Sequence, residues 1–478
     1  MAFQQLQGPA KLQEVTQLLQ SLETDLQDKN LTCVNMARVL PTRVQSTAVK
    51  YKPPRLTLDK LGIGILARYG IDGETPDVRR AALRCVANAL LLDGKMRQVF
   101  VDTGYAGKLA ERLRTDNSED EMVASRILFL ITYDTNINFD DLIKNHSLGD
   151  NVNYQMSRHA KQFPKSGKQQ LTQMDELALI DTLKVIFNVS KIYPDLSGTF
   201  SPSIPSILKI ISRMEIPAKA LDGLVSYLIN SLSVLDLEGK KGKLENNPLF
   251  PTFNQNCNVD KLINILDQAV LTYPPEELEE KAVPLLHSLI IIHEIAPEGS
   301  RKYMQWLLLP EDNDRSQPIG RSDTLASRLL KLSTTPYPNL KTSISELMFV
   351  LSGKNPENLT RRIGYGFAAG FLASRGLEIP QNASEAFATN AEGVSSEVNP
   401  ITGQRWAAEP EDTGPPMTQE EKEERSGATL CSVRKMAELL ILSNFRARAN
   451  GILKMENPVA QAVREGRFEE LPDDADSD

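Results

Sequence analysis

The stretch VIFNVSKI, residues 185–192, sets one asparagine inside a run of apolar residues, and five other stretches of the chain align with it. They are VANALLL (86–92), ILFLITYD (127–134), LINSLSVL (228–235), LHSLIIIH (286–293) and MFVLSGK (348–354). The aligned column consists of Asn88, Leu130, Asn188, Asn230, Ser288 and Val350. The steps between these positions are 42, 58, 42, 58 and 62 residues. Because 42 residues is the length of an armadillo or HEAT unit, the column predicts a repeat array.

The array is predicted to be made of helices. Apolar residues recur at helical spacing, as they do between residues 12 and 26, and no period-2 alternation is sustained. The longer steps contain polar stretches at 149–170, 239–258 and 310–322, which we expect to be loop insertions. The fold class is therefore all-α, an armadillo/HEAT-like α-solenoid superhelix.

Helix starts can be recognised from their capping residues. Thr75 precedes Pro76, and a threonine before a proline at the first helical position is typical of a helix N-terminus. The sequences SEDE (118–121) and TQEE (418–421) fit the capping-box pattern, in which the first side chain caps the helix. We therefore expect helices to begin at these three places.

The composition excludes several classes of protein. The 478 residues are 41% hydrophobic, which is enough to bury a large core. The net charge is −8, of which −6 lies in residues 456–478, and an acidic chain is atypical of nucleic-acid binding. No run approaches the roughly 18 apolar residues of a transmembrane helix, and the first residues do not resemble a signal peptide. We expect a cytoplasmic protein that binds no nucleic acid.

Residues that could support catalysis or bind metal are scattered. The four cysteines form no CxxC pair, and the four histidines have no ligand spacing, so reduced thiols and ordinary histidines are expected. The sequence KSGK (165–168) lacks the rest of a phosphate-binding loop, and the GxG fragments at 62–64 and 364–366 follow no predicted strand. We therefore expect no catalytic residue, no metal and no cofactor.

Polar residues in register suggest a binding surface. One helical turn before the column, the first three stretches carry Arg84, Arg126 and Lys184. In an armadillo array the third helix of each unit faces a groove, where asparagine can bond a bound backbone and a cation can bind a carboxylate. Alternatively, the asparagines bond neighbouring groups of the chain and the cations are only solvated. The predicted partner-binding residues are Arg84, Asn88, Arg126, Lys184, Asn188 and Asn230.

A glycine-rich stretch, GYGFAAGFLASRGL at residues 364–377, carries a family resemblance. Further stretches agree with it, namely ELMFVL (346–351), LRCVANAL (83–90), SRILFL (125–130), NPITG (399–403) and PMTQEEKE (416–423). Together they resemble the synembryn family, the non-receptor exchange factors and folding chaperones of heterotrimeric G-protein α subunits. The resemblance extends over residues 1–424, is closest in form to fungal members, and implies an armadillo-type fold.

The resemblance implies a protein that acts by binding rather than by covalent chemistry. It implies that the C-terminal helix of the G-protein α subunit (Gα) lies in the concave groove, that GDP is released, and that nucleotide-free Gα is stabilised. Arg84, Asn88, Arg126 and Asn188 lie in stretches that match the family. We expect a monomer that binds Gα and reaches the plasma membrane through it. The alternative is an armadillo-type scaffold that binds peptides and has no exchange activity.

The predicted domain organisation has four parts. An armadillo-type domain covers residues 1–375, a flexible linker covers 376–417, a C-terminal helical segment covers 418–466, and an acidic tail covers 467–478. Within the helical segment, residues 425–445 depart from the family pattern, either as a natural variant or as a translated intron.

Overall fold

The computed structural model describes residues 17, 24, 60–165, 171–239, 247–377, 398–399 and 403–409. The chain divides into two compact units, Met1–Glu409 and Pro410–Asp478, and all the described residues belong to the first. The predicted C-terminal helical segment, including residues 425–445, and the acidic tail lie outside the described residues.

The described residues form helices and no β-strand, apart from a single bridge between Val398 and Arg405. The first half contains α3 (Lys60–Asp72), α4 (Pro76–Leu92), α5 (Lys95–Asp102), α6 (Ala106–Arg112), α7 (Ser118–Leu130), α8 (Phe139–His146), α9 (Leu148–Lys161) and α10 (Gln173–Ile192). The second half contains α11 (Ile204–Arg213), α12 (Leu224–Val234), α13 (Cys257–Thr272), α14 (Pro275–Lys281), α15 (Val283–Ile295), α16 (Glu298–Leu308), α17 (Leu325–Leu332), α18 (Pro338–Leu351), α19 (Pro356–Ile363) and α20 (Tyr365–Ser374). The short 3-10 helices are η1 (Pro194–Ser203), η2 (Asp312–Ser316) and η3 (Trp406–Ala408).

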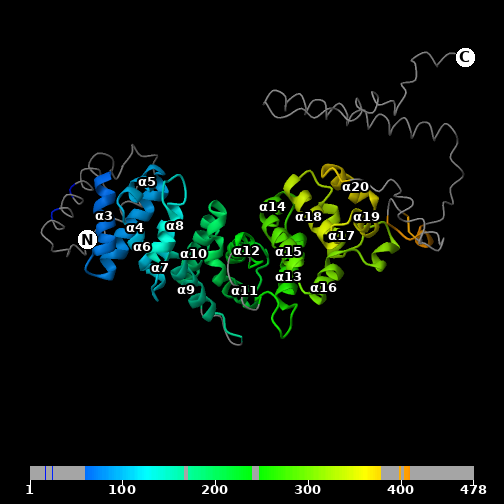
Figure 1. The fold of residues 1–478 in the computed structure, drawn as a ribbon, viewed down its shortest axis with the longest axis horizontal. Helices are drawn as coiled ribbons and strands as arrows, with labels where there is room; N and C mark the ends of the chain where they lie inside the picture. The colour runs from blue at the N-terminus through cyan, green and yellow to red at the C-terminus, as the bar shows by residue number, and fades with distance from the viewer. Residues whose placement is uncertain are drawn as a thin grey trace, which may run out of the picture. The chain divides into compact units, whose positions relative to one another are not determined.

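Six helices form a continuous ladder through the array. Each of α4, α7, α10, α12, α15 and α18 packs on the next one in this order, and Figure 1 shows them following one another along the chain. The six stretches aligned in the sequence lie at the carboxyl ends of these six helices. The all-α repeat fold is therefore confirmed. We call α4, α7, α10, α12, α15 and α18 the ladder helices.

Burial on several sides explains the long apolar runs of the ladder helices. Helix α10 packs on α7 before it, on α12 after it, and on α9 and η1. Its residues Leu183, Val185 and Ile186 are therefore fully buried although they point in different directions around the helix. A helix that is buried on all sides has a sequence of consecutive apolar residues with a few polar interruptions. The six stretches aligned in the sequence share this pattern.

One of the three predicted loop insertions is wrong. Most of residues 149–170 belongs to α9. The described residues of the stretch 239–258 contain no α-helix before α13 begins at Cys257, and the stretch 310–322 contains only the 3-10 helix η2. In α9, Val152 and Met156 lie one turn apart and are fully buried. The sequence of α9 is polar because some of its side chains form hydrogen bonds with the preceding unit. Gln155 Nε2, for example, donates to the Leu113 carbonyl at 2.6 Å. A buried, bonded glutamine cannot be told from a loop residue by composition.

Helix capping follows the expected chemistry with one correction. Thr75 caps α4 by accepting from the Val78 amide, and Pro76 occupies the first helical position, as predicted. The cap of α7 is Asn117, whose side chain accepts from the amides of Glu119 and Asp120, so the prediction that Ser118 is the cap is wrong. Asparagine and serine cap helices about equally well, so the sequence could not distinguish Asn117 from Ser118, which follows it directly.

Part of the predicted linker is docked on the array. The Arg405 amide donates to the Arg315 carbonyl at 2.9 Å, and Arg315 Nη1 donates to the Gly403 carbonyl at 3.0 Å. Gln404 is buried, and its Nε2 donates to the Ser316 carbonyl at 3.3 Å. Gly403 has a φ of +66°, and a Cβ placed there would lie 2.2 Å from Ile319 Cδ1. The flexible linker therefore stays a prediction only for its residues outside this docked segment.

None of the helices in the part of the chain that the structure describes is both long enough and apolar enough to cross a membrane.

We expect Ile186→Ala to destabilise the array by about 2–5 kcal/mol, because Ile186 is fully buried between ladder helices and its truncation leaves a cavity. Urea unfolding followed by circular dichroism would measure the change. Ile192→Ala is the matched control on the same helix, since Ile192 is 46% exposed and should cost less than about 0.5 kcal/mol. Equal costs for the two variants would contradict the ladder packing.

We expect Gly403→Ala to release the docked segment, because alanine is strained at positive φ and its Cβ would collide with Ile319. Hydrogen exchange at the Arg405 amide should then accelerate about tenfold. Gly370→Ala in α20 is the control, because nothing lies within 4 Å of its Cβ position. Unchanged exchange at Arg405 in the Gly403 variant would show that the segment tolerates a side chain there.

Candidate functional site: the ladder helices

The first predicted cation joins two ladder helices. Arg84 on α4 donates from Nη2 to Glu119 Oε2 of α7 at 3.1 Å, and both side chains are 40% exposed. Arg80, one turn earlier, pairs with Asp120 at 2.6 Å. The acids of the first turn of α7 also lie at the positive end of its helix dipole. Arg84 therefore has an internal partner but keeps further N–H groups exposed to solvent.

The next two cations meet at one buried carboxylate. Asp181 of α10 is 2% exposed, and it accepts from Arg126 Nη2 at 2.8 Å and from Lys184 Nζ at 3.1 Å. The Lys184 ammonium also lies 5.2 Å from the centre of the Phe129 ring and 5.3 Å from that of Tyr227. This cluster links α7, α10 and α12 and fixes the two cations in one geometry.

The three predicted asparagines differ in their surroundings. Asn188 is 7% exposed and donates from Nδ2 to Thr132 Oγ1 at 2.8 Å, so its amide is used within the ladder. Asn88 Nδ2 is buried and has no hydrogen-bond partner. Asn230 is half-buried, and its side chain makes no hydrogen bond with a described residue. The structure therefore brings Arg126, Lys184 and Asn188 together, and leaves Asn88 and Asn230 with unused amide groups.

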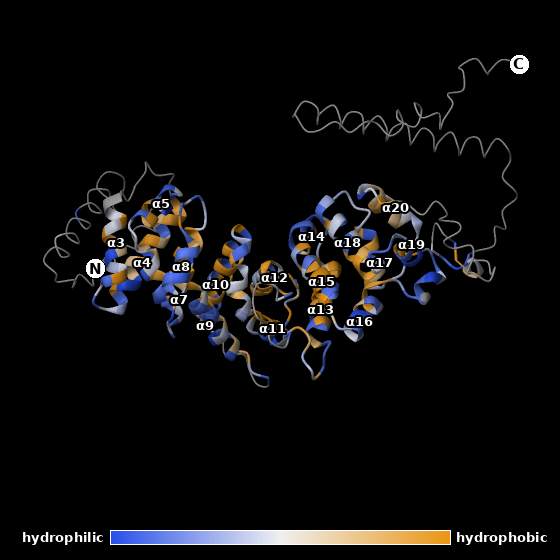
Figure 2. Cartoon of the chain, in the orientation of Figure 1, coloured by the Kyte–Doolittle hydropathy of each residue, from blue (hydrophilic) through white to orange (hydrophobic). Residues whose placement is uncertain are grey.

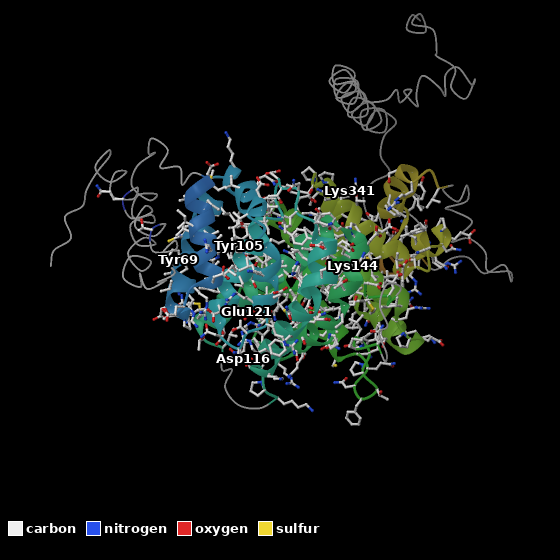
Figure 3. The ribbon with its side chains drawn as sticks, turned by 60° about the vertical axis from the view of Figure 1, so that its left-hand side comes forward. Tyr69, Tyr105, Asp116, Glu121, Lys144 and Lys341 are labelled. Atoms are coloured by element: carbon white, nitrogen blue, oxygen red, sulfur yellow. The ribbon has the colours of Figure 1, made fainter. Side chains whose placement is uncertain are left out.

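A buried polar network lies beneath this surface. Glu121 of α7, labelled in Figure 3, is fully buried, and Thr182 of α10 donates to its Oε1 at 2.7 Å. His159 Nε2 of α9 lies 2.9 Å from both carboxylate oxygens, and Arg158 forms an ion pair with the same group. A buried carboxylate is stable only with such partners. The network therefore holds α7, α9 and α10 in one arrangement.

Exposed apolar side chains gather at the carboxyl ends of the first three ladder helices. The bond between Asn188 and Thr132 places the ends of α7 and α10 together. The exposed fractions are 62% and 58% for Leu91 and Leu92, 40% for Tyr133 and 46% for Ile192. Figure 2 colours the residues by hydropathy, and most of the apolar residues of these helices are buried. We call Leu91, Leu92, Tyr133 and Ile192 the apolar ends.

Sequence reasoning missed the acids and the apolar ends of this surface. Asp181 lies three residues before Lys184 on the same helix, a spacing that brings opposite charges together and could have indicated the pair. The apolar ends lie three or four residues after the aligned column, but the sequence does not distinguish them from the buried members of the same runs. Their exposure depends on how far each helix extends beyond its neighbour.

Hydrogen bonds depress the pKa of Asp175 at the start of α10. Burial alone would raise this pKa, but hydroxyl groups of Ser118 and Thr172 donate to the carboxylate, and the pKa is held at about 2. Thr172 and Asp175 form a reciprocal capping box. Ser118 thus links the first turn of α7 to the first turn of α10.

Comparison with known proteins identifies a family and several relatives. Residues 55–467 match the family described as guanine nucleotide exchange factor synembryn. The chain is 23% identical to the mouse protein named Chaperone Ric-8A over 429 residues, which cover 83% of this chain and 78% of the mouse protein. It is 24% identical to the zebrafish Chaperone Ric-8A over 493 residues, covering 92% and 87% of the two chains. A Caenorhabditis briggsae protein named Chaperone ric-8 is 25% identical over 274 residues, covering 48% of each chain.

We expect Ser118→Ala to raise the pKa of Asp175 from about 2 towards its ordinary value of 3.8, because a donor to the ionised form is lost. The folded-state pKa lies below the unfolded one, so ionised Asp175 stabilises the fold above about pH 4, and this stabilisation is lost as the pH falls through 3.8 towards 2. Ser118→Ala should therefore lower stability at pH 7 and reduce its loss on acidification.

Carboxyl chemical shifts during an NMR titration, together with urea unfolding at pH 7 and pH 3, would measure both effects. Ser212→Ala is the control, because this exposed hydroxyl donates only to the Lys209 carbonyl. An unaltered Asp175 titration in the Ser118 variant would show that the hydroxyl does not set this pKa.

Proposed function

Because the chain belongs to the synembryn family of guanine nucleotide exchange factors, we propose that it binds a heterotrimeric Gα subunit, releases its GDP and stabilises the nucleotide-free subunit. The relatives from mouse and zebrafish are named chaperones, and we extend a chaperone role for Gα to this chain. The match over residues 55–467 carries this proposal, since it includes every ladder helix. We further propose that the protein works as a monomer in the cytoplasm.

The proposed mechanism is preferential binding of one conformation of the partner. A ligand shifts a conformational equilibrium only by the difference between its affinities for the two states. Turning a population of 1:99 into 99:1 takes a preference of about 5.5 kcal/mol. We propose that the displaced C-terminal helix of Gα supplies this preference by binding to the ladder helices only when it has left the nucleotide-binding domain.

The apolar ends and the neighbouring polar groups support this docking site. An amphipathic helix binds by laying its apolar face on exposed apolar side chains, and Leu91, Leu92, Tyr133 and Ile192 offer such a surface. A carboxylate of the partner could share Arg84 with Glu119, because arginine carries five N–H donors. Rotating the side-chain amide group of Asn88 by 180° would exchange the positions of Nδ2 and Oδ1. The Nδ2 group could then donate a hydrogen bond to a carbonyl of the partner.

The internal ion pairs refine the roles of the predicted residues. Arg126 and Lys184 already share Asp181, so a partner carboxylate would have to compete with a buried acid at that place. Asn188 is bonded to Thr132 and serves the ladder itself. We therefore propose that Arg84 and Asn88 contact Gα directly, while Arg126, Lys184 and Asn188 hold the ladder helices in position.

An armadillo-type scaffold that binds a peptide without exchange activity is the second candidate. It would use the same apolar ends and the same polar groups. The two functions differ in the response to GTP, because an exchange factor binds the nucleotide-free subunit and must release it when GTP and Mg²⁺ bind. A scaffold complex should persist.

We expect this protein to accelerate the release of fluorescent GDP from a Gα subunit and to form a complex that dissolves when GTP and Mg²⁺ are added. Arg84→Ala and Asn88→Ala should each weaken binding of a peptide from the Gα C-terminus by about 1–3 kcal/mol, because a desolvated partner group is left unpaired. Arg68→Ala is the control, since Arg68 is an exposed cation on α3, outside the ladder.

The outcomes separate the two candidates. GDP release that stays at its basal rate, with a complex that survives GTP, would favour the scaffold. Peptide affinity that changes equally in the Arg68 and Arg84 variants would contradict the docking site but not the exchange activity.

A further inference from the structure

The most exposed large hydrophobic side chain of the described residues is Phe253. It is 96% exposed, whereas the next ones, Leu91 and Leu271, are each 62% exposed. Phe253 lies in the loop that leads into α13, and its neighbours Thr252, Asn254 and Gln255 are polar and exposed. A single aromatic ring held in water at a loop tip has no role in packing, so a binding role has to be considered.

Cations without ion pairs lie on the helices next to this loop. Lys161 ends α9, Lys165 follows it, and Lys209 and Arg213 lie on α11. None of the four forms a salt bridge with a described residue, whereas Lys281 and Lys302 elsewhere in the array do. Burial lowers the pKa of Lys209, and the nearby charges of Arg213 and Lys161 lower it further. These three cations are therefore close enough to repel one another.

Hydrogen bonds join the chain after α9, the end of α11 and helix α13, into which the Phe253 loop leads. Arg213 Nη1 donates to the Phe163 carbonyl at 2.8 Å, which ties the chain after α9 to the end of α11. Lys261 Nζ donates to the Met214 carbonyl at 3.2 Å, which ties the end of α11 to the start of α13. In Figure 1 the chain that leaves α9 and the loop that enters α13 project from the same side of the array.

We call the stretches 161–165, 209–217 and 250–261 the basic edge. They contain five cations and two carboxylates, Glu215 and Asp260. Both carboxylates are exposed, and Asp260 also accepts a hydrogen bond from the Tyr303 hydroxyl at 2.7 Å, so the three stretches together carry a net charge of +3. The edge is therefore positive although the whole chain carries a net charge of −8.

We propose that the basic edge binds an anionic membrane surface, with the Phe253 ring inserted among the lipid headgroups and the lysine and arginine side chains paired with lipid phosphates. Aromatic rings prefer the boundary between headgroups and acyl chains, and basic residues gain attraction from anionic lipids. A single ring and a few cations suffice at such a surface, because lipids rearrange around them.

A lipid surface fits this edge better than an acidic protein does. An aromatic anchor in a protein interface fills a pocket of the partner and is surrounded by a continuous contact area of both polar and apolar residues. Phe253 instead stands alone among polar loop residues, and the cations are spread over α9, α11 and the loop between α9 and α10. Cations that are spread over neighbouring helices in this way suit a flat charged surface better than a single binding pocket.

The proposed attachment is independent of Gα. The basic edge belongs to α9, α11, α13 and their loops, whereas the proposed Gα site belongs to the ladder helices. The chain could therefore be held at a membrane before it meets its partner. An experiment without Gα tests this proposal alone, so its failure leaves the proposed exchange activity untouched.

The test is sedimentation of the full chain with vesicles of phosphatidylcholine, with and without phosphatidylserine. We expect binding to the phosphatidylserine vesicles that weakens at high salt and little binding to pure phosphatidylcholine. Lys161→Ala and Lys209→Ala should each weaken binding about fivefold, and Phe253→Ser should weaken it about tenfold. Lys341→Ala and Leu271→Ser are matched controls, an exposed cation on α18 and an exposed leucine on α13, and should bind like the unchanged chain.

A second readout follows the ring itself. Phe253→Trp should show a blue shift of tryptophan emission on adding phosphatidylserine vesicles, whereas the unchanged chain, with only Trp306 and Trp406, should not. Equal binding to both kinds of vesicle, or unchanged binding by the Lys161, Lys209 and Phe253 variants, would overturn the proposal. Loss of poly-glutamate binding in the lysine variants, with no vesicle binding by the unchanged chain, would assign the edge to an acidic protein instead.

Discussion

Each interior ladder helix lies between two others, and the rest of the array depends on this constraint. A helix with neighbours before and after it, and further helices behind it, can expose only a narrow strip to solvent. Val185, Ile186 and Val189 of α10 are fully buried for this reason. A buried carboxylate inside the ladder then needs partners, which Glu121 finds in Thr182, Arg158 and His159. Because so little of a ladder helix is exposed, each exposed side chain on it is a candidate for contact with a partner.

The same constraint shapes how the ladder can recognise a partner. Arg126 and Lys184 are fixed by Asp181, and a surface ordered before binding loses less side-chain entropy when a partner arrives. In the docking that we propose, the exposed apolar ends would supply most of the contact area, and Arg84 and Asn88 would supply polar groups at its border. Affinity for a helix would come from apolar burial, and its orientation from the polar groups.

The helices outside the ladder are free to serve other purposes, since each needs only one apolar face. Helix α9 uses its buried polar residues to bind the preceding unit, and its end contributes Lys161 to the basic edge. Loops between units can carry exposed residues such as Phe253 without disturbing the ladder. A repeat architecture thus lets one chain keep the proposed site for a protein partner apart from the proposed site for lipids.

The sequence by itself determined the all-α repeat, because burial on several sides leaves apolar runs whose spacing equals the length of a unit. It also determined the family, through the stretch at 364–377, and the positions of Arg84, Asn88 and Lys184 on ladder helices. Tertiary structure alone decided the partners of these residues: Arg126 meets Asp181 55 residues later, and Arg315 meets Gly403 88 residues later. Helix α9 and the basic edge also became visible only there. The physical reason is that contacts between units depend on how each helix is rotated about its axis and how far it extends past its neighbour. The amino-acid sequence shows the spacing of the repeated helices but not their rotation.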